Sequence, residues 1–129
     1  MQSLSRHAPH ALALLRIITA LLFLQHGTMK LFGFPSMGDM GAGGLPPLMI
    51  VAGILEVAGG LLLLVGLFTR PAAFVLSGMM AVAYFMAHAP GGFFPALNGG
   101  EPAILFCFAF LYLVFAGPGS FSLDTRTRA

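Results

Sequence analysis

Charged residues are scarce in this chain of 129 residues. Six Lys and Arg together with four Asp and Glu make up 8% of the sequence, whereas a soluble domain carries about 25%. So few charges cannot build a solvated surface, and the composition therefore excludes a water-soluble globule, a coiled coil and a disordered chain. The basic residues are also too few to form the clustered footprint that binds nucleic acid.

Cysteine is equally scarce, because Cys107 is the single one in the sequence. The chain by itself therefore forms no internal disulfide and no dithiol relay. The sequence also has no haem-attachment motif, no tight cluster of metal ligands and no glycine-rich nucleotide fingerprint. We interpret Cys107 as an apolar filler within a helix.

Apolar residues are abundant and account for 58% of the chain. They fall into four segments, at residues 12–34, 46–68, 71–87 and 102–118. Because roughly 17–25 helical residues cross a bilayer, we predict an all-α, polytopic membrane protein, with a single domain over residues 1–129 that forms a bundle of four transmembrane helices. No small-residue cleavage site follows the first apolar core, which favours a retained span over a cleaved signal peptide. The last two segments are short, which favours tilt or local thinning of the bilayer.

The basic residues predict the orientation of the four spans. Arg6, Arg70, Arg126 and Arg128 fall on one side of the membrane, and Lys30 falls on the other. The positive-inside rule therefore predicts that both the N-terminus and the C-terminus are cytoplasmic. The two longer loops, which are rich in Gly, then lie on the outer face.

Each span carries its polar residues on one helical face when it is projected at 100° per residue. We expect these faces to line the interior, because ionisable groups within a membrane usually face the bundle. The faces consist of Arg16, Phe23, Gly27 and Lys30, flanked by Thr19 and His26, in the first span; Glu56 with Ala52, Gly53, Gly59 and Gly60 in the second; Ser77, Ala81, Tyr84 and His88 in the third; and Glu101, Leu105, Phe108, Tyr112 and Phe115 in the fourth.

A rise of 1.5 Å per residue places His26 and Glu56 at nearly the same depth. Lys30, His88 and Glu101 lie near the outer boundary. We therefore predict an outward-facing pocket of these five residues, which are candidates for ligand binding or proton handling. Two alternatives stay open: a hydrogen-bonded plug that fixes the register of the helices, and headgroup contacts for Lys30 and Glu101.

Arg16 lies deeper towards the cytoplasm than these five residues. An unpaired charge at that depth is costly, so we predict a structural ion pair between Arg16 and Glu56. His26 and His88 come from different helices and are not part of a local metal or haem motif, and we assign no metal site to them.

Several short motifs occur in a characteristic order. They are His26-Gly27, Gly53-Ile54-Leu55-Glu56, Gly66-Leu67-Phe68-Thr69-Arg70, Asn98-Gly99-Gly100-Glu101 and Gly117-Pro118-Gly119. In this order and spacing the sequence resembles the DoxX family of small four-helix proteins of the bacterial inner membrane, over nearly the whole chain. The resemblance implies a setting in redox or sulfur metabolism, with a quinone as the candidate ligand and soluble redox proteins as candidate partners.

On this basis we expect a membrane subunit that is associated with redox chemistry and surrounded by the lipid bilayer. Whether it is itself an enzyme stays open, and a quinone-facing or non-catalytic subunit of an oxidoreductase fits the sequence. A small-molecule or proton-coupled transporter that acts as an oligomer is one alternative, and a structural membrane adaptor is another.

Overall fold

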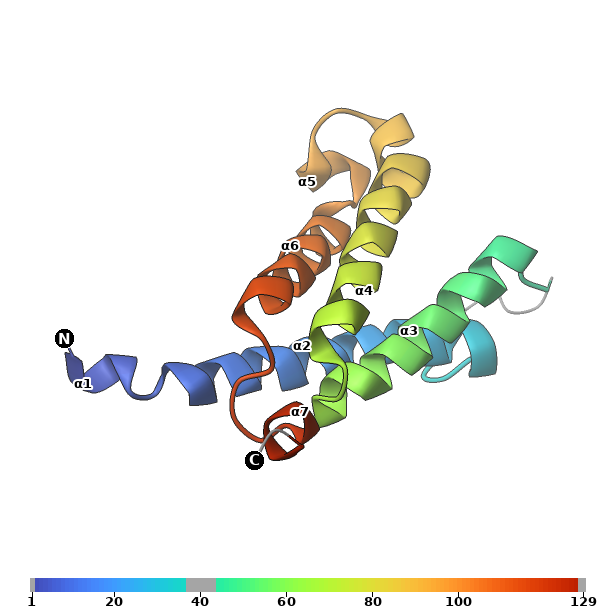
Figure 1. The fold of residues 1–129 in the computed structure, drawn as a ribbon. Coiled ribbons are helices and arrows are strands. Elements are labelled where there is room, and N and C mark those ends of the chain that lie inside the picture. The colour runs from blue at the N-terminus through green and yellow to red at the C-terminus, as the bar shows by residue number, and fades with distance from the viewer. Residues whose placement is uncertain (1, 37–43, 128–129) are drawn as a thin grey trace.

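The computed structural model describes residues 2–36 and 44–127 of the chain (Figure 1). These two ranges contain helices and no strand, which confirms the predicted all-α fold. The four main helices are α2 (Ala8–Phe32), α3 (Pro47–Val65), α4 (Thr69–Ala83) and α6 (Glu101–Ala116). The shorter elements are α1 (Gln2–Ser5), α5 (Pro95–Asn98), α7 (Leu123–Arg126), a π-helical turn (Tyr84–His88) and a 3₁₀ turn (Ala89–Gly91).

The main helices have the length and apolar composition of membrane spans, with one exception. Helix α2, helix α3 and the continuous helical segment Thr69–Gly91 contain 25, 19 and 23 residues and are long enough to cross a bilayer. The third span is longer than predicted, because the helix continues through the π-helical and 3₁₀ turns. Helix α6 has 16 residues and is about 24 Å long, which is short for a hydrocarbon core of about 30 Å.

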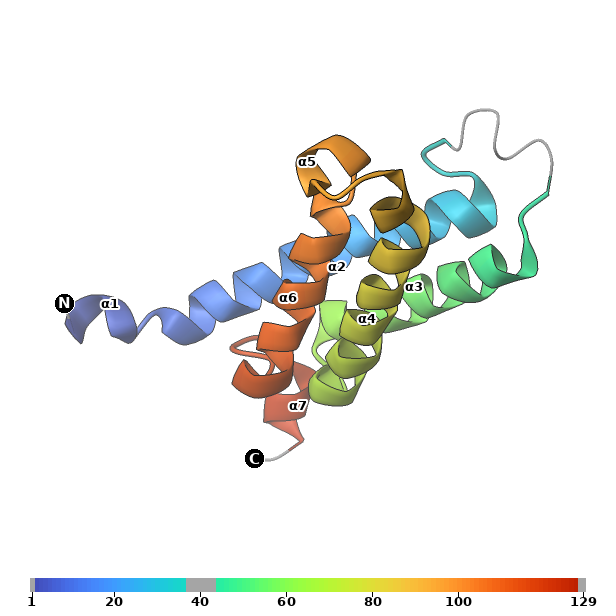
Figure 2. The same cartoon turned by 90° about the horizontal axis from the view of Figure 1, so that it is seen from above.

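The four main helices form two antiparallel hairpins, α2–α3 and α4–α6 (Figure 1). The hairpins lie together at the end of the molecule where α3 turns into α4. Towards their other ends they diverge, as Figure 2 shows from a second direction. The bundle is therefore closed at one end and open between the hairpins at the other.

Glycine residues allow α2 and α3 to approach each other closely, as their position on the inward faces predicts. A Cβ atom on Gly27 would lie 2.8 Å from Val57 Cγ2, and a Cβ atom on Gly60 would lie 2.7 Å from Leu24 Cγ. Real Cβ atoms essentially never lie this close to another atom. A larger residue at either position would therefore force neighbouring atoms of the first hairpin to shift.

An aromatic contact joins the two hairpins at the centre of the core. The rings of Phe23 on α2 and Phe110 on α6 meet edge to face, with their centroids 4.8 Å apart. Within the second hairpin, the hydroxyl of Ser77 donates a hydrogen bond of 2.8 Å to the carbonyl of Cys107. Cys107 is half-buried beside this core.

The predicted inward face of the fourth span is wrong. Its five members, Glu101, Leu105, Phe108, Tyr112 and Phe115, are all exposed in the structure. Helix α6 instead buries Ala103, Phe110 and Leu113. The prediction took Glu101 as the marker of the inner face, but the rest of α6 is apolar all round and its packing against α2 and α4 sets its rotation. In the third span, Ser77 is buried, and Tyr84 and His88 are half-buried.

Three segments that are distant in the sequence meet at the closed end of the bundle. The buried guanidinium of Arg16 donates hydrogen bonds to the carbonyls of Pro118 and Phe121. The carboxylate of Asp124 accepts hydrogen bonds of 2.9 Å from the backbone N–H groups of Phe68 and Thr69, at the start of α4. The chain after α6 therefore holds the start of α2 and the α3–α4 turn together.

Both ends of the described chain are consequently on the same side of the bundle, which an even number of spans requires. The backbone N–H of Ser120 donates a hydrogen bond of 3.0 Å to the carbonyl of Pro9, and the rings of His10 and Phe121 are in contact. Arg70 and Arg126 also belong to this end of the fold, whereas Arg128 lies outside the described residues. The side of the membrane that this end faces stays a prediction.

Candidate functional site

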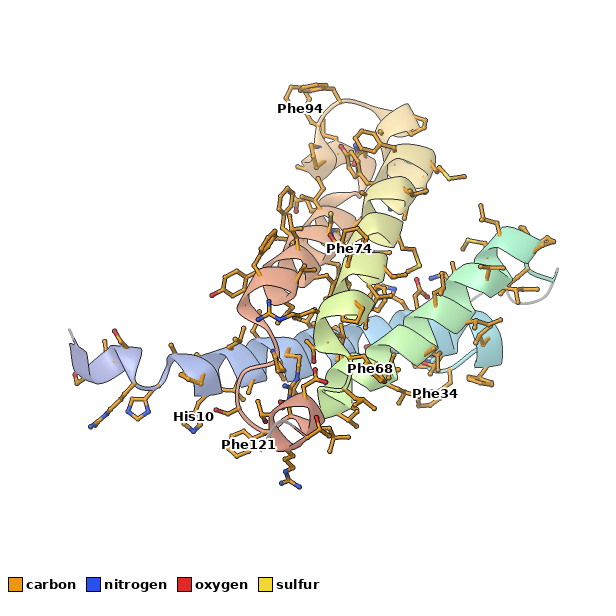
Figure 3. All side chains as sticks on the ribbon, in the orientation of Figure 1. His10, Phe34, Phe68, Phe74, Phe94 and Phe121 are labelled. Atoms are coloured by element: carbon orange, nitrogen blue, oxygen red, sulfur yellow. The ribbon has the colours of Figure 1, made fainter. Side chains whose placement is uncertain are left out.

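A cavity of about 330 Å³ lies between the two hairpins. All four main helices contribute to its walls, and most of the lining is apolar, including Phe23, Met49, Met79, Met80 and Phe106. Four ionisable side chains also line it, namely His26, Lys30, Glu56 and His88. The structure therefore brings together four of the five residues that were predicted to form a pocket. Figure 3 shows the side chains of both hairpins on the ribbon.

The two central polar residues of the cavity form an ion pair. Lys30 Nζ lies 2.8 Å from each carboxylate oxygen of Glu56. The side chain of Glu56 is only 4% exposed and that of Lys30 is 16% exposed. The mutual attraction of a buried ion pair offsets the cost of removing both charges from water only when the geometry is good. Here both carboxylate oxygens lie within hydrogen-bonding distance of Lys30 Nζ.

The predicted ion pair between Arg16 and Glu56 is therefore wrong. The register of the first hairpin places Gly27 directly against Glu56, since a Cβ atom on Gly27 would lie 2.9 Å from Glu56 Cβ. Arg16 is eleven residues before Gly27, which corresponds to about 16 Å along the helix. Glu56 is thus within reach of Lys30, whereas Arg16 binds backbone carbonyls at the closed end. Lys30 is consequently not extended towards the headgroups either.

His88 reaches the cavity from the π-helical turn that continues α4. Its Nδ1 atom lies 3.1 Å from the backbone carbonyl oxygen of Asn98. Its ring stacks on that of Tyr84, with the centroids 6.4 Å apart and the planes 26° apart. Turns of this kind are rare and often occur at functional sites. Here the turn places His88 on the cavity wall.

His26 lies at the rim of the cavity and is exposed. Its ring meets that of Phe106 on α6 edge to face, with the centroids 5.9 Å apart. The imidazole of α2 therefore contacts the second hairpin at the edge of the cavity.

Glu101 does not line the cavity and is exposed, so its predicted place in the pocket is wrong. It is the first residue of α6, and a negative charge at the N-terminus of a helix is favourable because of the helix dipole. Its neighbours Gly99, Pro102 and Ala103 line the cavity in its place.

Asn98 was predicted only as part of the motif Asn98-Gly99-Gly100-Glu101 and not as a residue of the site. Its side-chain amide donates to the carbonyl of Gly92 at 2.9 Å and to the hydroxyl of Tyr84 at 3.3 Å. Its Oδ1 atom accepts a hydrogen bond of 2.8 Å from the N–H of Gly100. The sequence signal was the Asn-Gly-Gly run, which is typical of a turn in which the side chain of Asn bonds to the backbone. Asn98 thereby fixes the loop that carries the hydrogen-bond partner of His88.

The described residues contain no group of three or more His, Cys, Asp or Glu side chains that could hold a metal ion. The polar groups of the cavity are instead an ion pair and two imidazoles, surrounded by Met, Phe and Ala side chains. Such a lining is typical of sites for small organic molecules, which are mostly apolar with a few placed polar groups.

Comparison with known proteins agrees with this architecture. The DoxX family model matches residues 11–89, which covers most of α2 and all of α3, α4 and the π-helical turn. The chain belongs to the DoxX family. With its apolar helices, this DoxX protein is an integral membrane protein.

The similar proteins cover nearly the full length of this DoxX chain. An uncharacterized protein of Haemophilus influenzae is 50% identical, and the match covers 98% of this chain and 97% of that protein. The inner membrane protein YphA of Escherichia coli is 32% identical, with 92% of this chain and 91% of that protein covered. The inner membrane protein YqjF of Escherichia coli is 31% identical, with 84% and 85% covered. No solved structure matches the chain.

Proposed function

We propose that this DoxX protein is a membrane subunit of the bacterial inner membrane that binds a small ring-bearing molecule of the quinone class between its two hairpins. The observation that carries the proposal is the convergence of His26, Lys30, Glu56 and His88 on one cavity that is otherwise apolar. The quinone class comes from the family resemblance, and the inner-membrane location is supported by the names of the two Escherichia coli relatives.

The size of the cavity supports a small ligand. A volume of about 330 Å³ is at the lower end of the range for small-molecule sites. It suits one substituted ring, and the aromatic side chains Phe23 and Phe106 offer surfaces for that ring. A long apolar tail would extend through the opening between the hairpins into the lipid.

The polar groups support a ligand whose oxygen atoms sit on a ring. Lys30 has three N–H donors and directs two of them at Glu56, so one donor is left for a ligand carbonyl. The imidazoles of His26 and His88 can hydrogen-bond to ring oxygens and exchange protons with them. A bound quinone would supply the redox chemistry, and soluble redox proteins are the partners that we propose for the exchange of electrons.

The test is the chemical analysis of ligands that remain with the purified protein. The full chain is extracted together with native lipids, and co-purifying quinones are measured by mass spectrometry. We expect quinone at about one molecule per chain in the wild type. We expect a loss of most of it in His26→Ala and His88→Ala, with normal accumulation of both variants in the membrane. His10→Ala is the matched control, because His10 lies at the closed end of the bundle against Phe121.

A variant that fills part of the cavity from an exposed position of its lining separates binding from folding. Ala87 is exposed and lines the cavity, whereas Val82 is exposed on the same helical segment and does not line it. We therefore expect Ala87→Phe to lose the ligand and Val82→Phe to keep it. The opposite outcome has two parts: the histidine variants lose ligand and membrane accumulation in parallel, and Ala87→Phe retains the ligand. In that case the polar residues form only a plug that fixes the register of the helices, and the proposal is wrong.

A further inference from the structure

The hydrogen bond of His88 determines which of its two ring nitrogens carries the proton. Nδ1 lies 3.1 Å from the carbonyl oxygen of Asn98, and a carbonyl oxygen can only accept a hydrogen bond. Nδ1 must therefore be the protonated nitrogen. In the neutral ring the other nitrogen, Nε2, then has a lone pair and no hydrogen, so that it is an acceptor.

The ring of His88 is held in this orientation from several directions. Tyr84 stacks on one face of it, and the hydroxyl of Tyr84 accepts a hydrogen bond from the side chain of Asn98. A Cβ atom on Gly100 would lie 2.4 Å from the ring of Tyr84, so Gly100 packs tightly behind that ring. A flip of the ring would put Cδ2 in the place of Nδ1 and would break the hydrogen bond to Asn98.

Nε2 of His88 has no hydrogen-bond partner within residues 2–36 and 44–127, although the residue is half-buried and lines the cavity. A polar atom at the wall of an apolar cavity gains stability when a ligand satisfies it. Lys30, which also lines the cavity, has a donor to spare. The lining thus offers both a hydrogen-bond acceptor and a hydrogen-bond donor.

We infer that the cavity recognises a ligand that presents a ring hydroxyl to His88, which means the phenolic, reduced form of the ring and not the fully oxidised form. The inference rests on the proposed function and makes the ligand class narrower. An oxidised ring carries only carbonyl oxygens, and a carbonyl facing Nε2 would oppose one acceptor with another. A hydroxyl on the same ring donates to Nε2 and completes the hydrogen bonding of His88.

The experiment compares three probes that differ only at the ring oxygens: tetramethylhydroquinone, its dimethyl ether and the corresponding benzoquinone. The full chain is placed in lipid nanodiscs, and binding is measured by equilibrium dialysis against empty nanodiscs, which correct for partition into lipid. One neutral hydrogen bond corresponds to a roughly fivefold difference in affinity. We expect the wild type to bind the hydroquinone about fivefold more tightly than the ether and the quinone, and we expect His88→Phe to bind all three alike.

A second measurement reports the state of His88 without any ligand. The ¹⁵N and ¹³C chemical shifts of labelled histidine distinguish the two neutral tautomers, and the signal of His88 is identified by its loss in His88→Phe. We expect the tautomer that is protonated at Nδ1. A ring protonated at Nε2 would overturn the inference.

The possible results separate this inference from the proposed function. If the wild type binds the quinone or the ether as tightly as the hydroquinone, the inference is wrong and the proposed function stands. If none of the three probes binds above empty nanodiscs, the proposed function is wrong, and the inference falls with it even where the tautomer is the expected one. The comparison among the probes is made in the wild type, so it holds even if His88→Phe does not fold.

Discussion

Lys30 on α2 and Glu56 on α3 form a two-pronged ion pair, in which Nζ lies 2.8 Å from both carboxylate oxygens. The pair joins the two helices of the first hairpin at the wall of the cavity. It gives this wall no net charge while leaving one N–H of Lys30 unused. An apolar ligand can therefore lie against the pair without burying an uncompensated charge.

Removing one partner of this pair should destabilise the protein more than removing both. Breaking a buried pair leaves a lone buried charge and costs about 3–5 kcal/mol. Lys30→Met and Glu56→Gln should each lower the free energy of unfolding by an amount at the lower end of that range, because the side chain of Lys30 is 16% exposed. The double variant should recover at least half of the loss. Reversible unfolding in detergent measures all four proteins, and additive losses in the double variant would contradict the pairing.

Gly27 should not tolerate even the smallest side chain. The added methyl group of Gly27→Ala would meet Val57 Cγ2, Glu56 Cβ and the backbone nitrogen of Val57 at 2.8–2.9 Å. Backbone cannot give way as a flexible side chain can, and we expect a loss of about 1–3 kcal/mol in stability. The control is Gly78→Ala, because nothing lies within 4 Å of the added atom. Alanine should be neutral there or stabilising by up to about 1 kcal/mol. Equal stability of the two variants would argue against the close contact of α2 and α3.

The closed end of the bundle should require the guanidinium group of Arg16, and a lysine ammonium should not replace it. Its planar guanidinium donates to two carbonyls at once, whereas a lysine ammonium on a flexible stem is a poor substitute at such a site. We predict that Arg16→Lys increases the amide hydrogen exchange of Ser120 and Asp124, whose N–H groups bond to Pro9 and Gly66. Arg126→Lys, at an exposed position, should leave that exchange unchanged. Unchanged protection in Arg16→Lys would show that the segment is held by other contacts.

The orientation in the membrane can be tested with a reporter that is active only in the periplasm. Arg6, Arg70 and Arg126 belong to the closed end, and the positive-inside rule predicts that this end is cytoplasmic. The reporter should therefore be silent when it is fused after Ala129 and active when it is inserted at Gly92, in the loop at the open end. The reverse pattern would invert the predicted topology.

Helical periodicity predicted the faces of α2 and α3 well, because each of these helices has both polar and small residues that mark its buried side. Glu56 and its neighbouring glycines are buried as expected. It failed for α6, where Glu101 is the only charged residue and lies at the helix end. There the aromatic contact between Phe23 and Phe110 decides the rotation, and no one-dimensional pattern contains that contact.

The sequence predicted which residues line the cavity more accurately than it predicted which of them form an ion pair. Depth counting brought His26, Lys30, Glu56 and His88 to one region, and the structure places all four on one cavity. The choice of Arg16 as the partner of Glu56 failed because it depended on how far a long side chain reaches, while the true partner follows from the register of the hairpin. The π-helical turn also could not be foreseen, since Asn98, which bonds to Tyr84 at the start of that turn, lies 14 residues further along the chain.

The contacts of Arg16 have a consequence for the order of biosynthesis. Its acceptor on Pro118 is 102 residues further along the chain, so the ribosome makes the cation long before it makes the carbonyls that bind it. A newly made α2 must therefore enter the membrane with an unsatisfied guanidinium near the end that we predict to be cytoplasmic, where water and headgroups can still solvate it. Only after residues 118–124 have left the ribosome can Arg16 become buried and the two hairpins lock together. The segment that follows α6 thus completes the fold around the start of α2.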